Sequence, residues 1–328
     1  MSHPDAVAPG WLQASQAPLI DMFDVALLDL DGTLYRGTHV VPQAPEVVAA
    51  LRKAGARPAF VTNNASRPPA AVVEHLSALG FTCDVTEVMT AAQAGAALVA
   101  ARVPPGSAVL VVGGSGVRQA LLERGLRPVD RADNGPVAVL QGWAPDLSWT
   151  GLAEGAFALA AGLPWIVTNT DLTLPTDRGI APGNGSFVAL LATVSGRSPD
   201  AVAGKPMTPL LEQAIAKLSA QRPIAVGDRL DTDIAGAGAV SVPSLLVLSG
   251  VTDLRALLQA GPTMRPTVLA GDVTGLLRAH RGAQISADGT WSCGRWTARC
   301  VHDPRPDGPT AGRPRRDSTV VWPGCAID

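Results

Sequence analysis

Short runs of Val, Leu and Ile alternate along the chain with longer stretches in which apolar residues recur at helical spacing. Continuous apolar runs of this length predict buried strands, and the amphipathic stretches between them predict helices. Strands separated by helices assemble most readily into a mainly parallel sheet, so the pattern predicts an α/β fold. The expected strands are residues 25–30, 58–62, 224–227, 244–248 and 267–270. The expected helices are residues 46–53, 70–79, 209–218 and 232–239.

A second series of strands and helices interrupts this pattern, with apolar runs such as "SAVLVVGG", "PVAVLQGW" and "PWIVTNTD". The flanking segments "RVPPG" and "GRSPDAVAGKP" are rich in residues that break regular structure. We therefore expect an inserted α/β domain at residues 102–200, which divides the first domain into residues 20–101 and 201–282. Residues 283–328 are expected to be a disordered or incomplete tail, because "HDPRPDGPTAGRPRRDS" offers almost nothing to bury.

The composition limits the kinds of partner. The chain has 328 residues, of which 47% are hydrophobic and 16% charged, which is enough apolar material for a substantial core. With a net charge of -2 and no basic face before residue 300, nucleic acid and anionic membranes are not expected partners. The N-terminus lacks the features of a signal peptide, and no apolar run approaches about 18 residues. We expect a cytoplasmic protein that acts on small molecules.

Two aspartates follow the first expected strand in "VALLDLDGT". Asp29 and Asp31 stand at the carboxyl end of that strand, where open α/β sheets bind their ligands. If strand geometry extends this far, both side chains point to the same face. Two neighbouring carboxylates resist ionising together, and a divalent cation relieves their repulsion. The alternative is an Asp-Gly turn that ends the strand and has no function.

Two other segments offer groups that bind anions. Thr62 and Asn63 follow the second strand in "FVTNNASR" and can present a hydroxyl and backbone amides, although an ordinary turn would have the same composition. Lys205 in "VAGKPMTPLL" precedes a helix that proline can initiate. A cation at a helix N-terminus is unfavourable unless an anion lies between them, and the alternative is a solvated lysine.

The segment "PIAVGDRLDTDIAGA" adds a third carboxylate at the same edge of the sheet. Asp228 ends an apolar strand there, and Asp231 and Asp233 follow at the start of a helix. Asp231 is explained as a helix cap, whereas Asp228 has no such explanation. Three carboxylates at one sheet edge suit a site for a hard cation such as Mg²⁺.

In this order, "DLDGT", "VTNN", "GKP" and "GDRLDTD" resemble the four motifs of the haloacid dehalogenase (HAD) superfamily. The large insertion between the second and third motifs is similar to that of the NagD-type, or p-nitrophenylphosphatase, branch, which includes phosphoglycolate and glycerol-3-phosphate phosphatases. The resemblance covers about residues 22–280. It implies a Rossmann-like parallel-sheet core with an inserted α/β cap of the C2 type, and it allows a homodimer formed through the cap.

The resemblance also implies a role for each motif residue. Asp29 would be the nucleophile that forms an aspartyl-phosphate, and Asp31 the general acid and base. The groups that would hold the phosphoryl oxygens are Thr62, Asn63 and Lys205. The ligands of Mg²⁺ would be Asp29, the Asp31 backbone carbonyl and Asp228, with Asp233 in support.

The expected activity is Mg²⁺-dependent hydrolysis of small phosphate monoesters, with glycerol 3-phosphate or 2-phosphoglycolate as the leading substrates. The alternatives are a sugar phosphomutase, a broad-specificity p-nitrophenylphosphatase or nucleotidase, and a non-catalytic binding module on the same scaffold. The polar segment at residues 169–186 could face the active site, or it could be a surface loop of the cap. Within it, Arg178 is the candidate to bind a second anionic group of the substrate.

Overall fold

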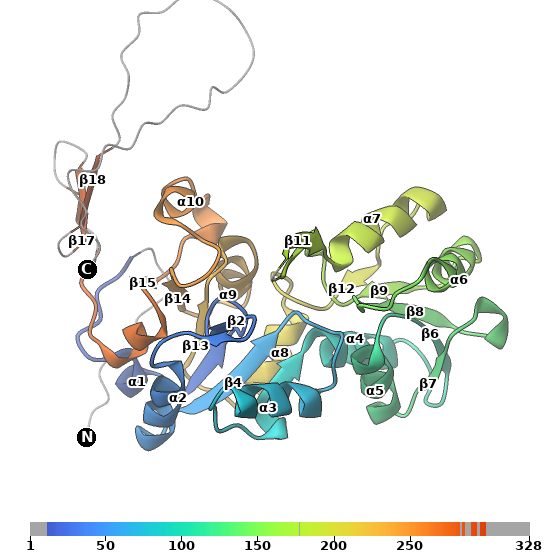
Figure 1. The fold of residues 1–328 in the computed structure, drawn as a ribbon, viewed down its shortest axis with the longest axis horizontal. Coiled ribbons are helices and arrows are strands. Elements are labelled where there is room, and N and C mark those ends of the chain that lie inside the picture. Colours follow the sequence, from blue (N-terminus) through green and yellow to red (C-terminus); the bar gives the residue numbers. More distant parts are fainter. Residues whose placement is uncertain (1–11, 177, 283, 286–289, 294–295, 300–328) are drawn as a thin grey trace, which may run out of the picture.

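The computed structural model describes residues 12–176, 178–282, 284–285, 290–293 and 296–299. The chain forms two parallel sheets, each with helices on both faces, which lie next to each other in Figure 1. The first sheet has six strands in the order β15-β14-β13-β1-β4-β5, and the second has five in the order β12-β9-β8-β6-β7. These sheets confirm the predicted α/β class with a Rossmann-like core.

The six-stranded sheet is buried on both faces. Its strands are β1 (Val25–Leu28), β4 (Arg57–Thr62), β5 (Val88–Thr90), β13 (Pro223–Gly227), β14 (Ser244–Val247) and β15 (Val268–Ala270). Along β1 the side chains alternate: Ala26 and Leu28 belong to one hydrophobic cluster, and Val25 and Leu27 to another. This double burial explains why the strand is a continuous apolar run.

Helices from distant parts of the chain supply the two layers around this sheet. The layer beside Leu28 comes from α1 (Leu19–Met22), α2 (Ala44–Lys53) and α3 (Pro69–Ala78). The opposite layer comes from α4 (Ala91–Ala100), α8 (Pro209–Lys217) and α9 (Ala235–Ala239). The remaining helical segments of this half are a π-helical turn, η3 (Leu230–Ile234), the helix α10 (Leu254–Leu258) and the 3-10 segments Val85–Glu87, Pro262–Met264 and Val273–Leu277.

The five-stranded sheet has its own core. Its strands are β6 (Ala108–Val112), β7 (Arg127–Val129), β8 (Ala138–Gln141), β9 (Trp165–Val167) and β12 (Ala201–Val202). Its helical segments are α5 (Ser115–Glu123), Ala132–Asn134, α6 (Trp149–Ala160) and α7 (Asn184–Ser195), and a hairpin of β10 (Thr173–Thr176) and β11 (Gly179–Pro182) precedes α7. One face of this sheet packs on α4 and α5, and the other on α6 and α7. We refer to residues 102–202 as the five-stranded unit.

Helix α4 joins the two cores. Ala91 and Ala94 pack in a cluster of the six-stranded sheet, whereas Ala92, Ala96 and Val99 pack with the five-stranded sheet. The helix is buried along several sides, which explains why its sequence, "AAQAGAALVA", has no polar face and was not among the expected helices.

Element boundaries differ from the expected ones by a few residues. Strand β1 ends at Leu28 rather than at residue 30, so both aspartates of the first motif follow the strand. Strand β12 pairs with β9, which extends the five-stranded sheet two residues past the expected limit of the insertion at residue 200. The expected helix at residues 232–239 is divided between η3 and α9.

The C-terminal segment, expected to be a disordered or incomplete tail at residues 283–328, contains short strands among its described residues. Strands β16 (Gln284–Ile285), β17 (Thr290–Cys293) and β18 (Trp296–Arg299) form a small antiparallel sheet. Each of β17 and β18 contains a Thr and a Trp, which favour strands, and β17 pairs with β18 at positions such as Trp291 and Ala298. The expectation for residues 300–328 falls outside the described residues. The other small sheet is the hairpin of β2 (Tyr35–Arg36) and β3 (His39–Val40).

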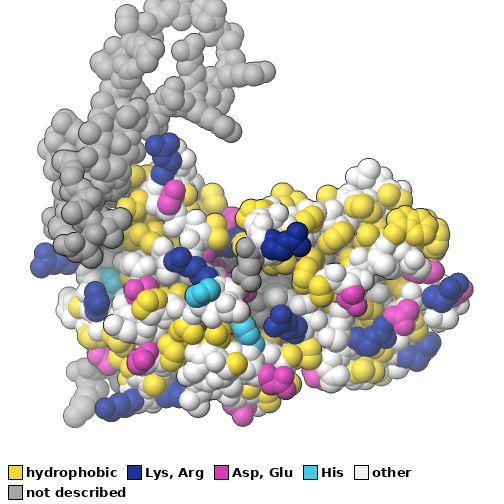
Figure 2. All heavy atoms as spheres, in the orientation of Figure 1, with side chains coloured by type: hydrophobic (Ala, Val, Ile, Leu, Met, Phe, Trp, Pro, Cys, Tyr) yellow, Lys and Arg dark blue, Asp and Glu magenta, His cyan; other side chains and the backbone are white. Residues whose placement is uncertain are grey.

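Among the described residues, none of the helices has both the length and the apolar character that crossing a membrane requires. Hydrophobic side chains nevertheless gather on the surface over α6 and α7 (Figure 2). Trp149 and Phe157 on α6 are 81% and 61% exposed, and Val194 on α7 is 66% exposed.

Candidate active site

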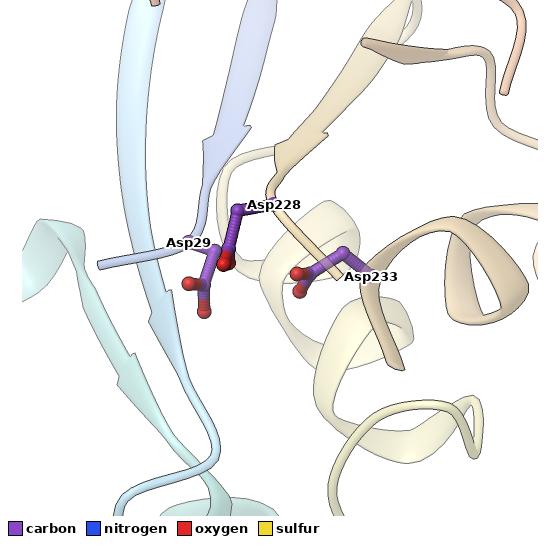
Figure 3. Close-up of side chains that lie close together, drawn as sticks. All are labelled: Asp29, Asp228 and Asp233. Carbon is purple, nitrogen blue, oxygen red and sulfur yellow. The ribbon is translucent and has the colours of Figure 1, made fainter. Parts of the chain in front are cut away.

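Three carboxylates meet at the carboxyl ends of β1 and β13. Asp29 follows β1, Asp228 follows β13, and Asp233 lies in the turn η3. Figure 3 shows the three side chains converging, and one oxygen atom from each lies within 4.8 Å of those from the others. Asp228 and Asp233 are only 0% and 5% exposed, so the charges are held away from bulk water.

Lys205 supplies a buried positive charge to this cluster. Its Nζ lies 2.6 Å from Asp29 Oδ1 and 2.6 Å from Asp233 Oδ1, and the side chain is 4% exposed. Burial by itself lowers the pKa of Lys205, but the charges of Asp233 and Asp29 outweigh burial and raise the pKa above its ordinary value. The lysine is therefore charged at neutral pH, and it lies between two of the carboxylates.

Three carboxylates share one lysine, and the pKa values of Asp29 and Asp228 are raised. Burial raises the pKa of Asp29 well above its usual range, and the charges of Asp233 and Asp228 add to this effect against the attraction of Lys205. Burial and the charge of Asp233 raise the pKa of Asp228 to about 7. The cluster thus has an excess of negative charge that a divalent cation would neutralise.

The donor set fits Mg²⁺. All the groups are oxygen ligands, which Mg²⁺ and Ca²⁺ prefer. Asp228 Oδ2 accepts a hydrogen bond from the backbone N–H of Val251 at 2.7 Å, whereas the buried Asp228 Oδ1 has no partner among the described residues. A buried carboxylate oxygen without a hydrogen bond is costly, so a cation at this oxygen would satisfy it.

Two glycines make room for the carboxylate of Asp228. A Cβ at Gly250 would lie 1.9 Å from Asp228 Oδ2, and a Cβ at Gly32 would lie 2.4 Å from the same oxygen. Gly32 also has a φ of +85°, which other residues rarely adopt. The turn after Asp31 therefore requires glycine both for its conformation and for its closeness to Asp228.

Asp31 lines the same cavity as Asp29. Both aspartates follow β1, which ends at Leu28, and the chain turns at Gly32 directly after Asp31. Asp31 is exposed as a residue, but neighbouring groups partly shield its carboxyl from water. This desolvation raises the pKa of Asp31, and the positive charges of His75 and Arg67 oppose the shift. A carboxyl with a raised pKa retains its proton more readily at neutral pH.

Thr62 and Asn63 lie at the end of β4, beside the carboxylate cluster. The hydroxyl of Thr62 accepts a hydrogen bond from the N–H of Asn64 at 3.0 Å, and a hydroxyl that accepts can still donate its own proton. The Asn63 side chain, however, bonds to the backbone of Lys205 and to Asp171. The backbone amide of Asn63 is therefore the group left for the expected contact with a phosphoryl oxygen.

These side chains line a cavity of about 620 Å³ between the two units, a size that suits a small metabolite. The segment at residues 169–186, expected to face the site or to be a surface loop, contributes part of the lining: Asn169, Asp171, Thr173, Leu174, Pro175, Thr176, Gly183 and Asn184. Arg178, the candidate for a second substrate anion, is exposed and is not one of the described residues that line the cavity.

The arginines that do line the cavity are Arg36 and Arg229. Arg229 donates two hydrogen bonds to Asp231, at 3.0 and 2.8 Å, and its Nη2 lies 3.9 Å from Asp171 Oδ1 across the cavity. The hydrogen bonds to Asp231 are the main reason that the pKa of Arg229 is raised. Arg229 belongs to the fourth motif, but no role was expected for it, and Asp171 was expected only as part of the polar segment at residues 169–186.

Two family models match separate parts of the chain. Residues 26–127 match the model of a haloacid dehalogenase-like hydrolase family, and residues 202–276 match a HAD-hydrolase-like model. Among curated proteins, the D-glycerol 3-phosphate phosphatase of Mycobacterium tuberculosis is 43% identical over 264 residues, which cover 80% of this chain and 73% of that protein. The 5'-nucleotidase YutF of Bacillus subtilis is 36% identical over 228 residues, which cover 69% of this chain and 87% of that protein.

Solved structures are similar as well. The glycerol phosphate phosphatase of Mycobacterium tuberculosis in complex with magnesium superimposes with a TM-score of 0.78 at 40% identity, covering 84% of this chain and 85% of that one. The p-nitrophenyl phosphatase of Archaeoglobus fulgidus gives a TM-score of 0.72 at 27% identity, covering 78% and 98%. Fold, sequence and the arrangement of the motifs agree, and the chain belongs to the haloacid dehalogenase-like hydrolase family.

Proposed function

We propose that this protein is a Mg²⁺-dependent phosphatase that hydrolyses small phosphate monoesters through an aspartyl-phosphate, with glycerol 3-phosphate as its leading substrate. The observation that carries the proposal is the position of the Asp29 carboxylate, 2.6 Å from the buried Lys205 Nζ and among two further aspartates. A carboxylate nucleophile, a fixed cation and a set of oxygen ligands are the groups that phosphoryl transfer requires.

In the first step, an Asp29 oxygen forms a bond to phosphorus and the bond to the leaving alcohol breaks. Asp31 donates its proton to that alcohol oxygen, and its raised pKa supports this role. In the second step, Asp31 takes a proton from water, whose oxygen attacks phosphorus and releases Asp29 and inorganic phosphate. The two aspartates thus divide the work between nucleophile and proton carrier.

The surrounding groups hold the transferring phosphoryl. Lys205 Nζ, the hydroxyl of Thr62 and the backbone amide of Asn63 are placed to donate hydrogen bonds to its oxygens. Mg²⁺ would be held by Asp29, Asp228 and the Asp31 carbonyl, with Asp233 in support, and it would offset the negative charge of nucleophile and phosphate.

The five-stranded unit serves in this proposal as the C2-type cap, which was expected at residues 102–200 between the two parts of the core. Trp143, Asn169 and Asn184 of this unit line the same cavity as Asp29 and Lys205. In this proposal the unit limits the water that would compete for the phosphoryl group before the aspartyl-phosphate forms. The core would then define the reaction and the cap the substrate.

The choice of glycerol 3-phosphate rests on the relative from Mycobacterium tuberculosis, which is named for that substrate and is 43% identical. 2-Phosphoglycolate and nucleotides are the next candidates, the latter because a 5'-nucleotidase is 36% identical. The test is to measure kcat/KM with Mg²⁺ for glycerol 3-phosphate, 2-phosphoglycolate, nucleoside monophosphates and p-nitrophenyl phosphate.

We expect glycerol 3-phosphate to exceed the other compounds by about tenfold or more in kcat/KM, a factor worth roughly 1.4 kcal/mol in transition-state binding. A flat profile would overturn the substrate but keep the phosphatase. An isomerised sugar phosphate without free phosphate would identify a mutase, and no turnover of any ester would overturn the enzymatic proposal.

We also infer that the protein is a cytoplasmic homodimer formed through the cap. The exposed apolar side chains of Trp149, Phe157 and Val194 support this assembly, because burying such a patch is favourable in water. Light scattering after size exclusion measures the mass directly. Trp149→Ser is expected to shift a dimer toward monomer, whereas a wild-type protein that elutes as a monomer at all concentrations would refute the assembly.

A further inference from the structure

Asn63 connects three segments that are far apart in the sequence. Its side-chain Oδ1 accepts a hydrogen bond from the backbone N–H of Lys205 at 2.8 Å, and its Nδ2 donates to the backbone O of Lys205 at 2.9 Å. The same Nδ2 lies 3.1 Å from Asp171 Oδ2 in the five-stranded unit. In addition, the backbone O of Asn63 accepts from Asn169 Nδ2 at 2.8 Å.

These contacts require a primary amide at position 63. The amide oxygen must accept a hydrogen bond from the backbone N–H of Lys205, and the amide nitrogen must donate to the carbonyl of Lys205 and the carboxylate of Asp171. An aspartate could only accept when ionised, and it would face the carboxylate of Asp171. The neighbouring Gly204 leaves space for the amide, because a Cβ there would lie 2.5 Å from Asn63 Oδ1.

The amide fixes the backbone from which the Lys205 side chain extends. It holds both the N–H and the C=O of that residue, so it limits rotation of the peptide units on either side. The Lys205 Nζ is within 2.6 Å of both Asp29 and Asp233, and a small shift of its backbone would change both distances. Misplacement of a catalytic-site group by about 1 Å can reduce the rate by about 100-fold.

The contact with Asp171 extends this link to the five-stranded unit and from there to the far side of the site. Asp171 Oδ1 lies 3.9 Å from Arg229 Nη2, and the backbone N–H of Arg229 donates to Asp233 Oδ2 at 3.1 Å. The segment carrying Asp171 is itself fixed, because its backbone O accepts from the N–H of Gly185 at the start of α7. One loop of the five-stranded unit therefore contacts both of the segments that surround the buried lysine.

We propose that Asn63 is a positioning residue that fixes the backbone of Lys205. Its ability to do so depends on whether the Asp171 loop, residues 168–172 between β9 and β10, is seated, meaning that Asp171 contacts Asn63. The inference rests on the proposed phosphatase function, in which Lys205 binds the phosphoryl group. When the Asp171 loop is seated, Asn63 has all its partners and the lysine is held at Asp29. When the loop is displaced, Asn63 Nδ2 loses one of its two acceptors and keeps only the carbonyl of Lys205, so the amide holds the Lys205 backbone less firmly.

The test is a set of variants assayed with glycerol 3-phosphate and Mg²⁺. We expect Asn63→Ala to lower kcat by about 10- to 100-fold with a smaller change in KM, and to weaken inhibition by inorganic phosphate about tenfold, because Lys205 is retained but misplaced. Asn134→Ala, at an exposed position of the 3-10 segment Ala132–Asn134, is the matched control and should leave activity unchanged. Thermal unfolding of each variant separates misplacement from loss of fold.

A reciprocal exchange tests the link to Asp171. Asn63→Asp places two carboxylates against each other and should be impaired at least as much as Asn63→Ala. The double variant Asn63→Asp with Asp171→Asn returns a donor and an acceptor to this contact, so it should recover at least about threefold over Asn63→Asp. If residue 63 had a purely structural role, the activity of each variant would change in parallel with its midpoint of thermal unfolding, and the double variant would not regain activity in this way.

The inference is overturned if kcat and phosphate inhibition of Asn63→Ala stay within twofold of the wild type. It is also overturned if the activity loss of the variants only follows their loss of thermal stability, or if the exchanged pair shows no recovery. These outcomes are distinct from a failure of the proposed function, which would appear as a wild-type protein that releases no phosphate at all.

Discussion

Lys205 Nζ and Asp29 Oδ1 lie 2.6 Å apart, so the proposed nucleophile and the proposed phosphate-binding cation are in direct contact. A phosphoryl oxygen that approaches Lys205 has to share this ammonium group with Asp29 and Asp233. The lysine therefore serves two purposes in the proposed mechanism: it stabilises the buried carboxylates before substrate binds, and it receives the phosphoryl charge afterwards.

Replacing Asp29 with asparagine should abolish turnover while preserving the fold. The amide has nearly the shape of the carboxylate, but it is a poor nucleophile for phosphorus. We expect kcat for glycerol 3-phosphate to fall at least about 10³-fold, with unchanged circular dichroism. Asp21→Asn, at an exposed position of α1, is the control and should keep full activity. Near-normal turnover by Asp29→Asn would exclude the aspartyl-phosphate.

Lys205→Met should reduce stability as well as activity. The change leaves Asp29 and Asp233 without their cation in a buried site, and breaking a buried ion pair on one side typically costs about 3–5 kcal/mol. Urea unfolding in the presence of a chelator measures this loss, and Lys53→Met, at an exposed position in the last turn of α2, provides the reference. A Lys205→Met protein as stable as the reference would mean that the lysine does not stabilise the cluster.

The carboxylate cluster could be predicted from the sequence because Asp29 and Asp228 each follow a recognisable buried strand, and Asp233 lies in the helical turn η3 soon after Asp228. Asp29 and Asp228 end neighbouring parallel strands, and parallel strands place their carboxyl ends at one edge of a sheet. Lys205 was singled out because it precedes a helix that proline can initiate, and α8 does begin at Pro209. The order of the four motifs then suggested its role, because a lysine before a helix is equally typical of a solvated position.

The contacts across the cavity could not be predicted in this way. Asn63, Asp171 and Arg229 lie on three separate loops, and their pairing depends on how the five-stranded unit packs against the six-stranded sheet. No periodic pattern carries that information, because loop residues have no fixed spacing. Arg178 was likewise not predictable. It belongs to the polar segment at residues 169–186, part of which lines the cavity, but it lies in the hairpin of β10 and β11, where it is exposed.

The metal-free protein should lose stability as pH rises, in part through Asp228. The pKa of this group is about 7 in the folded protein compared with an ordinary value of 3.8, so the folded state holds the proton more tightly than the unfolded chain does. The contribution to stability is complete below about pH 4 and is lost as pH rises through about 7. Urea unfolding in a chelator at pH 5 and pH 8 measures it.

Asp228→Asn is the matched variant for this pH dependence. It should reduce the difference in the free energy of unfolding between pH 5 and pH 8 by the order of a few kcal/mol, because the amide does not titrate. An equal pH dependence in both proteins would show that Asp228 is ionised throughout.

Mg²⁺ should stabilise the wild-type protein, and Asp228→Asn should remove most of this effect. A ligand present at about 100 times its dissociation constant adds about 2.7 kcal/mol when it binds only the folded state. Thermal unfolding with increasing Mg²⁺ at pH 8 measures the shift without any substrate. A shift that is equal in the wild type and in Asp228→Asn would place the cation elsewhere.

Gly250→Ala should disable the site although it adds only one methyl group. The new Cβ would lie 1.9 Å from Asp228 Oδ2, which is the oxygen that accepts from Val251, so either the carboxylate or the loop must shift. Because Asp228 is a proposed ligand of Mg²⁺, we expect a loss of at least about 100-fold in kcat/KM and a weaker stabilisation by Mg²⁺. Gly271→Ala is the matched control, since a Cβ at that position would meet nothing within 4 Å. If both alanine variants retain wild-type kinetics, the close packing around Asp228 is not needed for the reaction, and the carboxylate must tolerate displacement within the site.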